Sequence, residues 1–317
     1  MKTIIQTFKK YKKFLISTHV NPDPDALCSE AALALFLRSQ GKEVTILNEE
    51  KVPERFSFLP HIDQIKNCSQ VKNIDYDVAV ILDCGDLDRI GKVKESLGQD
   101  KIIINIDHHI INSRFGDLNL VHPRASSTAE VLFELLMALK ARLTRDMALH
   151  LYTGIMTDTG SFRYENTTPR THEIVGTLLR YRFSPSELYK RLYEMIPFGD
   201  LKEFTNLFKR MDLFFHGKVV CVMLPQKTVK KFSEEFDLRD TIFKFLRSIK
   251  GVEVHVILTG FTSRKTRVNL RSTGRVNVAK LAHLFKGGGH RRASGCVLGL
   301  NLHQAKEKIL RTVRTML

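Results

Sequence analysis

The chain has no tryptophan, few cysteines and no long apolar run. No stretch approaches the roughly 18 consecutive apolar residues of a membrane-spanning helix, so we expect no membrane partner. The basic N-terminal segment has only a short apolar run that ends in a polar turn, unlike a secretory signal peptide. The cysteines form no Cys-x-x-Cys pair, which argues against a structural zinc site. We expect a cytoplasmic protein with reduced thiols at Cys28, Cys68, Cys84, Cys221 and Cys296.

Acidic residues are also in short supply. The 317 residues include 34 Asp and Glu against 50 Lys and Arg, which gives a formal charge of +16. Such an excess favours an anionic partner, because it raises the local concentration of phosphate-bearing ligands. Nucleic acid, a nucleotide, an acidic membrane surface and plain solubility all remain open on charge alone.

What the chain does have is the length of about two domains and a regular alternation of apolar strands with amphipathic helices. This alternation predicts an α/β fold whose first domain has a mostly parallel sheet flanked by helices. We expect strands at 14–18, 44–47, 78–82 and 102–106, and helices at 26–39, 128–139, 146–157 and 171–181.

A connecting segment divides the predicted domains. Residues 187–212 contain two helical stretches broken by Pro197 and Gly199, and no strand signal. We therefore expect a first domain over 1–186 and a smaller α/β domain over 213–317. In the smaller domain we expect strands at 219–223, 252–259, 266–271 and 295–298, and helices at 238–249, 278–285 and 303–316.

Four predicted elements of the first domain end in acidic or imidazole side chains. The carboxyl ends of strands in an open α/β sheet meet at one crevice, so these side chains should converge. Four carboxylates in one crevice repel one another unless cations neutralise them, which favours a metal site over a bare acid and base pair. Oxygen and imidazole ligands without thiolates suit Mn²⁺ or Mg²⁺, with Fe²⁺ and Co²⁺ as alternatives. The residues are His19, Asp23 and Asp25, then Asp83, then Asp107, His108 and His109, and finally Asp158.

These residues resemble the DHH family of phosphoesterases, which is named for the triplet Asp107-His108-His109. The resemblance covers nearly the whole chain, because Gly287-Gly288-Gly289-His290 followed by Ala293-Ser294-Gly295 resembles the associated DHHA1 domain. Within the family, the two-domain length is most similar to oligoribonucleases that also dephosphorylate 3′-phosphoadenosine 5′-phosphate (pAp). The resemblance implies an active site in the cleft between the domains.

The resemblance also implies a role for each residue of the site. His19, Asp23 and Asp83 would hold one cation, and Asp25, Asp83, His108 and Asp158 would hold the other, so that Asp83 bridges two ions. Asp107 would orient the site without binding metal, and His109 would face the substrate phosphate or its leaving oxygen. Two divalent cations, with Mn²⁺ the first choice and Mg²⁺ or Co²⁺ as alternatives, would activate a water for attack on phosphorus.

In the second domain the same resemblance places Arg271 and the run Gly287, Gly288, Gly289 and His290 at the substrate. Successive glycines allow backbone N–H groups to approach an anion closely, which fits a phosphate. Arg291 and Arg292 lie nearby, and whether they extend the binding surface stays open. Ser127-Thr128-Ala129-Glu130 has the form of a helix cap, which explains it without a catalytic role.

We expect hydrolysis of very short RNA and of pAp as the activity. Three related activities are alternatives: hydrolysis of pyrophosphate or polyphosphate, RecJ-like digestion of single-stranded DNA, and cleavage of the dinucleotide pApA. A nucleotide sensor that binds without cleaving is a fourth alternative, which the complete set of metal-binding residues disfavours. A second copy of the chain is a further candidate partner.

Overall fold

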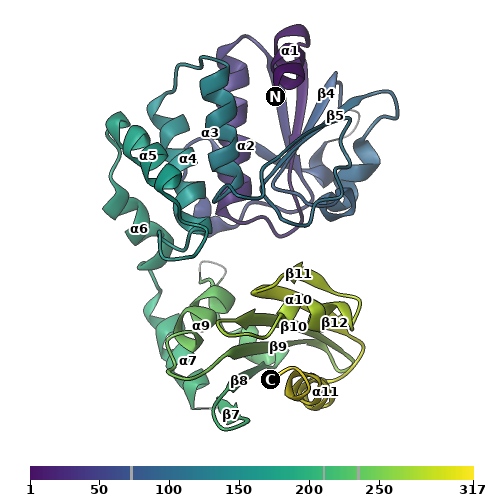
Figure 1. Ribbon diagram of the computed structural model, residues 1–317, viewed down its shortest axis with the longest axis vertical. Coiled ribbons are helices and arrows are strands. Elements are labelled where there is room, and N and C mark those ends of the chain that lie inside the picture. The colour runs from purple at the N-terminus through teal and green to yellow at the C-terminus, as the bar shows by residue number, and fades with distance from the viewer. Residues whose placement is uncertain (72–73, 210, 234–235) are drawn as a thin grey trace. The chain divides into compact units, whose positions relative to one another are not determined.

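A computed structural model describes residues 1–71, 74–209, 211–233 and 236–317. The chain divides into two compact units, Met1–Glu194 and Met195–Leu317 (Figure 1). This division lies inside the predicted connecting segment 187–212, although the domain boundaries 186 and 213 themselves stay predictions. Across the described ranges, no helix combines the length and apolar character that crossing a membrane requires.

The first unit is built on a six-stranded parallel sheet with the order β3-β2-β1-β4-β5-β6. Its strands are β1 (Lys13–Ser17), β2 (Glu43–Asn48), β3 (Ile65–Asn67), β4 (Val78–Leu82), β5 (Ile102–Asp107) and β6 (Leu118–Val121). Its helices are α1 (Lys2–Lys10), α2 (Pro24–Ser39), α3 (Thr128–Ala138), α4 (Arg145–Asp158), α5 (Pro169–Leu178) and α6 (Pro185–Tyr193), with 3₁₀ turns η1 (Glu54–Phe56), η2 (Ile62–Gln64), η3 (Cys68–Gln70), η4 (Leu87–Ser96) and η5 (Leu179–Tyr181).

The two faces of this sheet are covered differently. Phe14 and Ile16 of β1 pack on one face against the apolar side chains of α2, α3 and α4, which lie together in Figure 1. Leu15 points to the opposite face and packs with Ile90 and Val93 of the 3₁₀ turn η4. The alternation of side chains along a strand explains this division. Both faces are buried, which accounts for the nearly continuous apolar runs of β1 and β4.

The strand order places a topological switch point between β1 and β4. The chain leaves β1 toward β2 on one side, and β4 lies on the other side of β1. In open parallel sheets the crevice at such a point, beyond the carboxyl ends of the strands, is the usual ligand site. His19 follows β1 and Asp83 follows β4 directly, so the fold itself brings these two residues to the expected site.

The second unit has a mixed six-stranded sheet with the order β11-β12-β10-β9-β8-β7, in which only β8 and β9 pair in parallel among the described strands. Its strands are β7 (Asp212–Phe214), β8 (Val219–Leu224), β9 (Val254–Thr262), β10 (Lys265–Ser272), β11 (Gly288–His290) and β12 (Ala293–Leu298). Its helices are α7 (Phe198–Phe208), α8 (Gln226–Val229), α9 (Leu238–Leu246), α10 (Val278–His283) and α11 (Leu302–Arg314).

The α/β fold predicted from the sequence is confirmed in both units. The predicted strand 78–82 coincides with β4, and the other predicted strands and helices differ from the observed ones by a few residues at their ends. The short strands β3, β6, β7 and β11 and the single helical turn α8 were not predicted. Gly199 does not break the connecting segment as expected, because it lies within α7, which begins after Pro197.

Candidate metal centre

Seven predicted side chains come together at the carboxyl edge of the first sheet. Their nitrogen and carboxylate oxygen atoms form three overlapping groups, within each of which the candidate ligand atoms lie within 4.8 Å of one another. One group matches the first set of metal ligands expected from the sequence, and another matches the second set except for Asp83. The groups are His19 with Asp23 and Asp83, then Asp25 with His108 and Asp158, and then Asp83 with His108 and His109.

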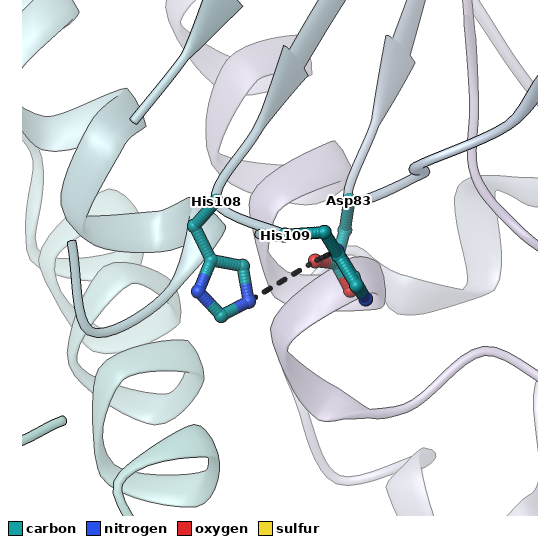
Figure 2. A group of neighbouring side chains, drawn as sticks. All are labelled: Asp83, His108 and His109. Atoms are coloured by element: carbon teal, nitrogen blue, oxygen red, sulfur yellow. Dashed lines mark ion pairs between the residues drawn. The ribbon is translucent and has the colours of Figure 1, made fainter. Parts of the chain in front are cut away.

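Asp83 lies at the centre of the cluster. It follows β4 in a left-handed backbone conformation with φ of 52°, and its side chain is almost fully buried. Its Oδ2 lies 3.4 Å from His19 Nε2, and its Oδ1 lies 3.7 Å from His108 Nε2. Figure 2 shows the His108 contact, with His109 beside it. Oδ1 also lies 3.6 Å from His109 Nδ1. The two oxygens of Asp83 therefore face different imidazoles.

Backbone carbonyls orient both imidazoles. His19 Nδ1 lies 2.9 Å from the carbonyl oxygen of Val20, and His108 Nδ1 lies 3.3 Å from that of Ala125. Because a carbonyl can only accept, each contact is a hydrogen bond when Nδ1 carries the proton. Nε2 is then the nitrogen that can bind a cation, and in both residues Nε2 is the atom near Asp83. Such outer contacts fix the tautomer of metal-binding histidines.

The charges of the cluster shift the pKa values of its members strongly. Burial by itself lowers the pKa of His19, but the hydrogen bond to Asp83 and the charges of Asp23 and Asp83 outweigh it and raise the pKa to about 9. Burial likewise opposes protonation of His108, yet Asp158, Asp83 and Asp25 raise its pKa to about 9. Without metal, protons therefore hold the positions that cations would take, and metal binding has to displace them.

The pKa values of the carboxylates in the cluster shift in opposite directions. Burial favours the neutral form of Asp83, but the hydrogen bond to His19 and the nearby imidazoles hold its pKa well below the usual range. Burial, followed by the charges of Asp83 and Asp158, raises the pKa of Asp25 well above its usual range. Burial raises the pKa of Asp158 to about 7. Crowded carboxylates that resist ionisation together are the expected state of a cation site without its cation.

Asp25 is held by the beginning of α3. Its Oδ2 accepts a hydrogen bond from the backbone N–H of Thr128 at 2.7 Å, and its Oδ1 accepts one from Ala129 at 3.0 Å. A helix N-terminus favours such an anion. Gly154 of α4 leaves room for this carboxylate, because a Cβ there would lie 2.5 Å from Asp25 Oδ1. Asp23, by contrast, is exposed and caps α2 through the Ala26 N–H.

Asp107 belongs to none of the three groups of candidate ligands, but it contacts His109, a member of one of them. Its Oδ1 lies 2.7 Å from His109 Nδ1, and its Oδ2 accepts a hydrogen bond from Asn112 Nδ2 at 2.6 Å. Burial by itself lowers the pKa of His109, but this contact and the charges of Asp83 and Asp107 raise it. Asp107 thus contacts both His109 and Asn112, and its expected role as an orienting residue stays a prediction.

The donor set fits divalent cations. Four carboxylates and three imidazoles, with no thiolate among the ligand groups found in the described residues, are donors of the kind that Mn²⁺ and related ions accept. Their convergence would be strongly unfavourable without compensating positive charge. The first unit therefore has groups that could bind metal at the place where an α/β sheet binds ligands.

The second unit brings the other predicted residues together along one end of its sheet. Ala293 of β12 pairs with Arg271 of β10 on one side and with the backbone of His290 in β11 on the other. The Arg271 guanidinium carbon lies 4.9 Å from the centre of the Phe243 ring. The side chain of His290 is outside what the structure describes. Arg292 donates a hydrogen bond to the Thr273 carbonyl, and Arg291 is exposed.

The three positions of the glycine run are occupied by glycine for different reasons. A Cβ at Gly287 would lie 2.2 Å from the Gly295 carbonyl oxygen, and one at Gly289, where φ is 132°, would lie 2.5 Å from that of Ala293. Close packing on β12 thus explains these two. A Cβ at Gly288 would meet nothing within 4 Å. Packing gives no reason for glycine at 288, which leaves the approach of a ligand as an explanation.

Sequence reasoning missed two residues that contact the cluster. Thr128 was interpreted as part of a helix cap, and Ser127 does cap α3, but the Thr128 hydroxyl also donates to Asp83 Oδ1 at 2.8 Å. Asn112 joins the loops after β4 and β5, because it contacts the Cys84 carbonyl as well as Asp107. Thr128 lies in a motif that a helix cap already explains, and Asn112 lies in no recognisable motif, so no sequence signal assigned either residue to the site.

Glu30 of α2 is a buried acid beneath this cluster, and we predict that Glu30→Gln stabilises the metal-free protein. Burial raises the Glu30 pKa from 4.5 to about 8, and Asn48 Nδ2 donates to its Oε2. Between these pH values the unfolded chain has lost this proton while the folded chain keeps it, so the free energy of unfolding falls as pH rises. Glutamine removes this dependence, with a gain of roughly 2–3 kcal/mol at pH 7.

Denaturant unfolding in chelator at pH 5 and pH 8 measures this effect. The increase in the free energy of unfolding of Glu30→Gln over the wild type should be small at pH 5 and larger at pH 8. Glu43→Gln, at an exposed position on the same strand as Asn48, is the matched control and should show no such growth. An equal gain at both pH values would contradict a raised Glu30 pKa.

Comparison with known proteins agrees with the geometry. The family model described as the DHH family, N-terminal domain, matches residues 13–155, and the DHHA1 domain model matches residues 222–317. The first match contains the three groups of candidate ligands except Asp158, and the second contains Arg271 and the glycine run.

Named relatives span nearly the whole chain. The bifunctional oligoribonuclease and PAP phosphatase NrnA of Thermus thermophilus is 33% identical over 94% of this chain and 88% of its own length, and that of Bacillus subtilis is 31% identical over 93% and 92%. A crystal structure of an exopolyphosphatase-related protein from Bacteroides fragilis matches with a TM-score of 0.89 and 26% identity, covering 98% of this chain and 94% of that one. The chain therefore belongs to the DHH family of phosphoesterases.

Proposed function

We propose that this protein is a Mn²⁺-dependent phosphoesterase that hydrolyses short oligoribonucleotides to mononucleotides and removes the 3′-phosphate of pAp. The observation that carries the proposal is the position of Asp83, whose two oxygens face His19 of one group of candidate ligands and His108 of another. The names of the Thermus and Bacillus relatives support the choice of substrates. The site would lie in the cytoplasm, where such substrates arise.

Each residue of the cluster has a part in this proposal. His19, Asp23 and Asp83 would hold one ion, and Asp25, Asp83, His108 and Asp158 the other. Two bound divalent cations supply a deprotonated water and positive charge for attack on phosphorus. His109, which Asp107 contacts and whose pKa the hydrogen bond to Asp107 and the charges of Asp83 and Asp107 raise, would donate a proton to the leaving oxygen.

The distribution of charge supports a polyanionic substrate. The unit from Met195 to Leu317 has 24 basic and 9 acidic residues, whereas the unit from Met1 to Glu194 has 26 and 25. Nearly all of the net charge of +16 thus belongs to the unit that carries Arg271 and the glycine run. We propose that residues 213–317 bind the nucleotide and that residues 1–186 provide the metal site. Our expectation that substrate binds between the domains stays a prediction.

Gly288→Ala tests the role of the second unit. The added methyl group has open space, so the free energy of unfolding should change by no more than about 1 kcal/mol, the usual cost of changing one glycine. If a phosphate approaches the backbone there, KM for pAp should rise about tenfold or more while kcat changes little. Gly289→Ala is the matched comparison, because its methyl group would clash with β12 and should destabilise the fold. Unchanged KM in a folded Gly288→Ala protein would remove this residue from the binding site.

A substrate panel tests the proposed function. Release of mononucleotide and phosphate would be measured with Mn²⁺ on a dinucleotide, a 24-nucleotide RNA, pAp, pApA and pyrophosphate. We expect the dinucleotide and pAp to be the best substrates. Faster hydrolysis of pyrophosphate, of pApA or of the long strand would replace the proposed function with the corresponding alternative. No hydrolysis of any of them with Mn²⁺, Mg²⁺ or Co²⁺ would refute it.

A further inference from the structure

Thr128 contacts both carboxylates that lie deepest in the candidate metal centre. Its hydroxyl donates to Asp83 Oδ1 at 2.8 Å, and its backbone N–H donates to Asp25 Oδ2 at 2.7 Å. The side chain is completely buried, and it is the first residue of α3 after the cap Ser127. The rigid start of a helix therefore fixes the position of both carboxylates through one residue.

The hydroxyl reaches one particular oxygen of Asp83. Oδ1 is the oxygen that faces His108 and His109, at 3.7 and 3.6 Å, whereas His19 lies near Oδ2, at 3.4 Å. Asp25, the other partner of Thr128, belongs to the same group as His108 and Asp158 and not to the group of His19. Thr128 thus contacts Asp25 of this group directly, and it contacts the oxygen of Asp83 that faces His108 of the same group.

We propose that Thr128 is a positioning residue that sets the affinity of one of two metal sites, the one formed by Asp25, His108 and Asp158 with Oδ1 of Asp83. This inference rests on the metal site of the proposed function and deepens it. A hydroxyl that donates to a carboxylate restricts its rotation and leaves its other lone pairs directed at the ion. Loss of such an outer contact typically weakens metal binding about 10- to 100-fold.

The test is calorimetric titration of the full-length, metal-free protein with Mn²⁺. Thr128→Val keeps the shape of the side chain and the backbone N–H but removes the hydroxyl. We expect this variant to weaken the binding of one of two Mn²⁺ ions by about 10- to 100-fold and to leave the affinity for the other ion unchanged. Thr128→Ser, which restores the hydroxyl, should bind both ions nearly as the wild type does.

Two further variants make the result specific. Thr153→Val is the matched control, because it removes an equally buried threonine hydroxyl that donates to the Leu149 carbonyl in α4. Asp158→Asn removes a ligand only from the site of Asp25, His108 and Asp158. Adding Thr128→Val to this variant should therefore not reduce the affinity for the ion at the other site. Thermal unfolding in chelator establishes that each variant folds, and Thr128→Ala replaces Thr128→Val if the valine protein does not.

The outcomes separate the two proposals. Unchanged affinities in the folded Thr128 variant, an equal loss in Thr153→Val, or failure of serine to restore binding would overturn the role of Thr128. If the wild type binds two ions but hydrolyses none of the panel, the proposed function fails while the affinity comparison still decides the role of Thr128. If the wild type binds no Mn²⁺, both proposals fail.

Discussion

Asp83→Asn is expected to abolish phosphoester hydrolysis, with a loss in kcat/KM of at least about a thousandfold. Asp83 is the member shared by two of the groups of candidate ligands, so its replacement by a neutral amide weakens both sites together. Metal ions contribute several kcal/mol to such reactions, and each 1.36 kcal/mol corresponds to about a factor of ten in rate. The amide is nearly the same size as the carboxylate, so the fold should persist.

Two measurements accompany the activity assay. Calorimetry should show that Asp83→Asn binds neither Mn²⁺ ion with the affinity of the wild type, and thermal unfolding in chelator should show a folded protein. Asp88→Asn is the matched control, because Asp88 is an exposed carboxylate of the segment after β4 that pairs with Lys94. Activity in Asp83→Asn within tenfold of the wild type would show that this carboxylate is not a shared ligand.

His109→Ala is expected to lower kcat by about 10²- to 10⁴-fold while both Mn²⁺ ions stay bound. This range is typical for the loss of one general acid. His109 Nδ1 is engaged by Asp107 at 2.7 Å, and this contact and the neighbouring carboxylates raise the His109 pKa, so the ring can hold a proton for the leaving oxygen. On a substrate whose leaving group needs no proton, the kcat of His109→Ala should fall much less.

His109 also belongs to a group of candidate ligands with Asp83 and His108, so the opposite result is informative. His108→Ala is the matched comparison, because it should weaken Mn²⁺ binding directly. If His109→Ala weakened Mn²⁺ binding as His108→Ala does but kept full turnover at saturating Mn²⁺, His109 would be a ligand and not the acid. A pH profile of kcat for the wild type and for His109→Gln provides a second readout, because only the wild type should lose rate as His109 deprotonates.

The convergence of the site could be predicted because it follows from topology. His19 and Asp83 follow adjacent parallel strands, and parallel strands present their carboxyl ends at the same edge. Their apolar runs identify those strands in the sequence, and the polar residues at each end stand out against them. Asp158 could be included for a similar reason, because it ends the helix α4 that packs on the same sheet.

The contacts that orient the ligands could not be predicted in the same way. The hydrogen bond from Thr128 to Asp83 joins residues 45 positions apart, and a threonine after a capping serine has an ordinary explanation as part of a helix start. The different reasons for Gly287 and Gly288 depend on the pairing of β11 with β12, and β11 is too short for a periodic pattern. Sequence identifies which groups converge, whereas packing decides which atoms they present.

Anomalous diffraction from crystals grown with Mn²⁺ would locate the bound ions. We expect two manganese peaks at the carboxyl edge of the first sheet, with His19 and Asp23 at one, Asp25, His108 and Asp158 at the other, and one oxygen of Asp83 at each. A single peak, peaks without Asp83 among their ligands, or manganese bound elsewhere on the chain would contradict this expectation.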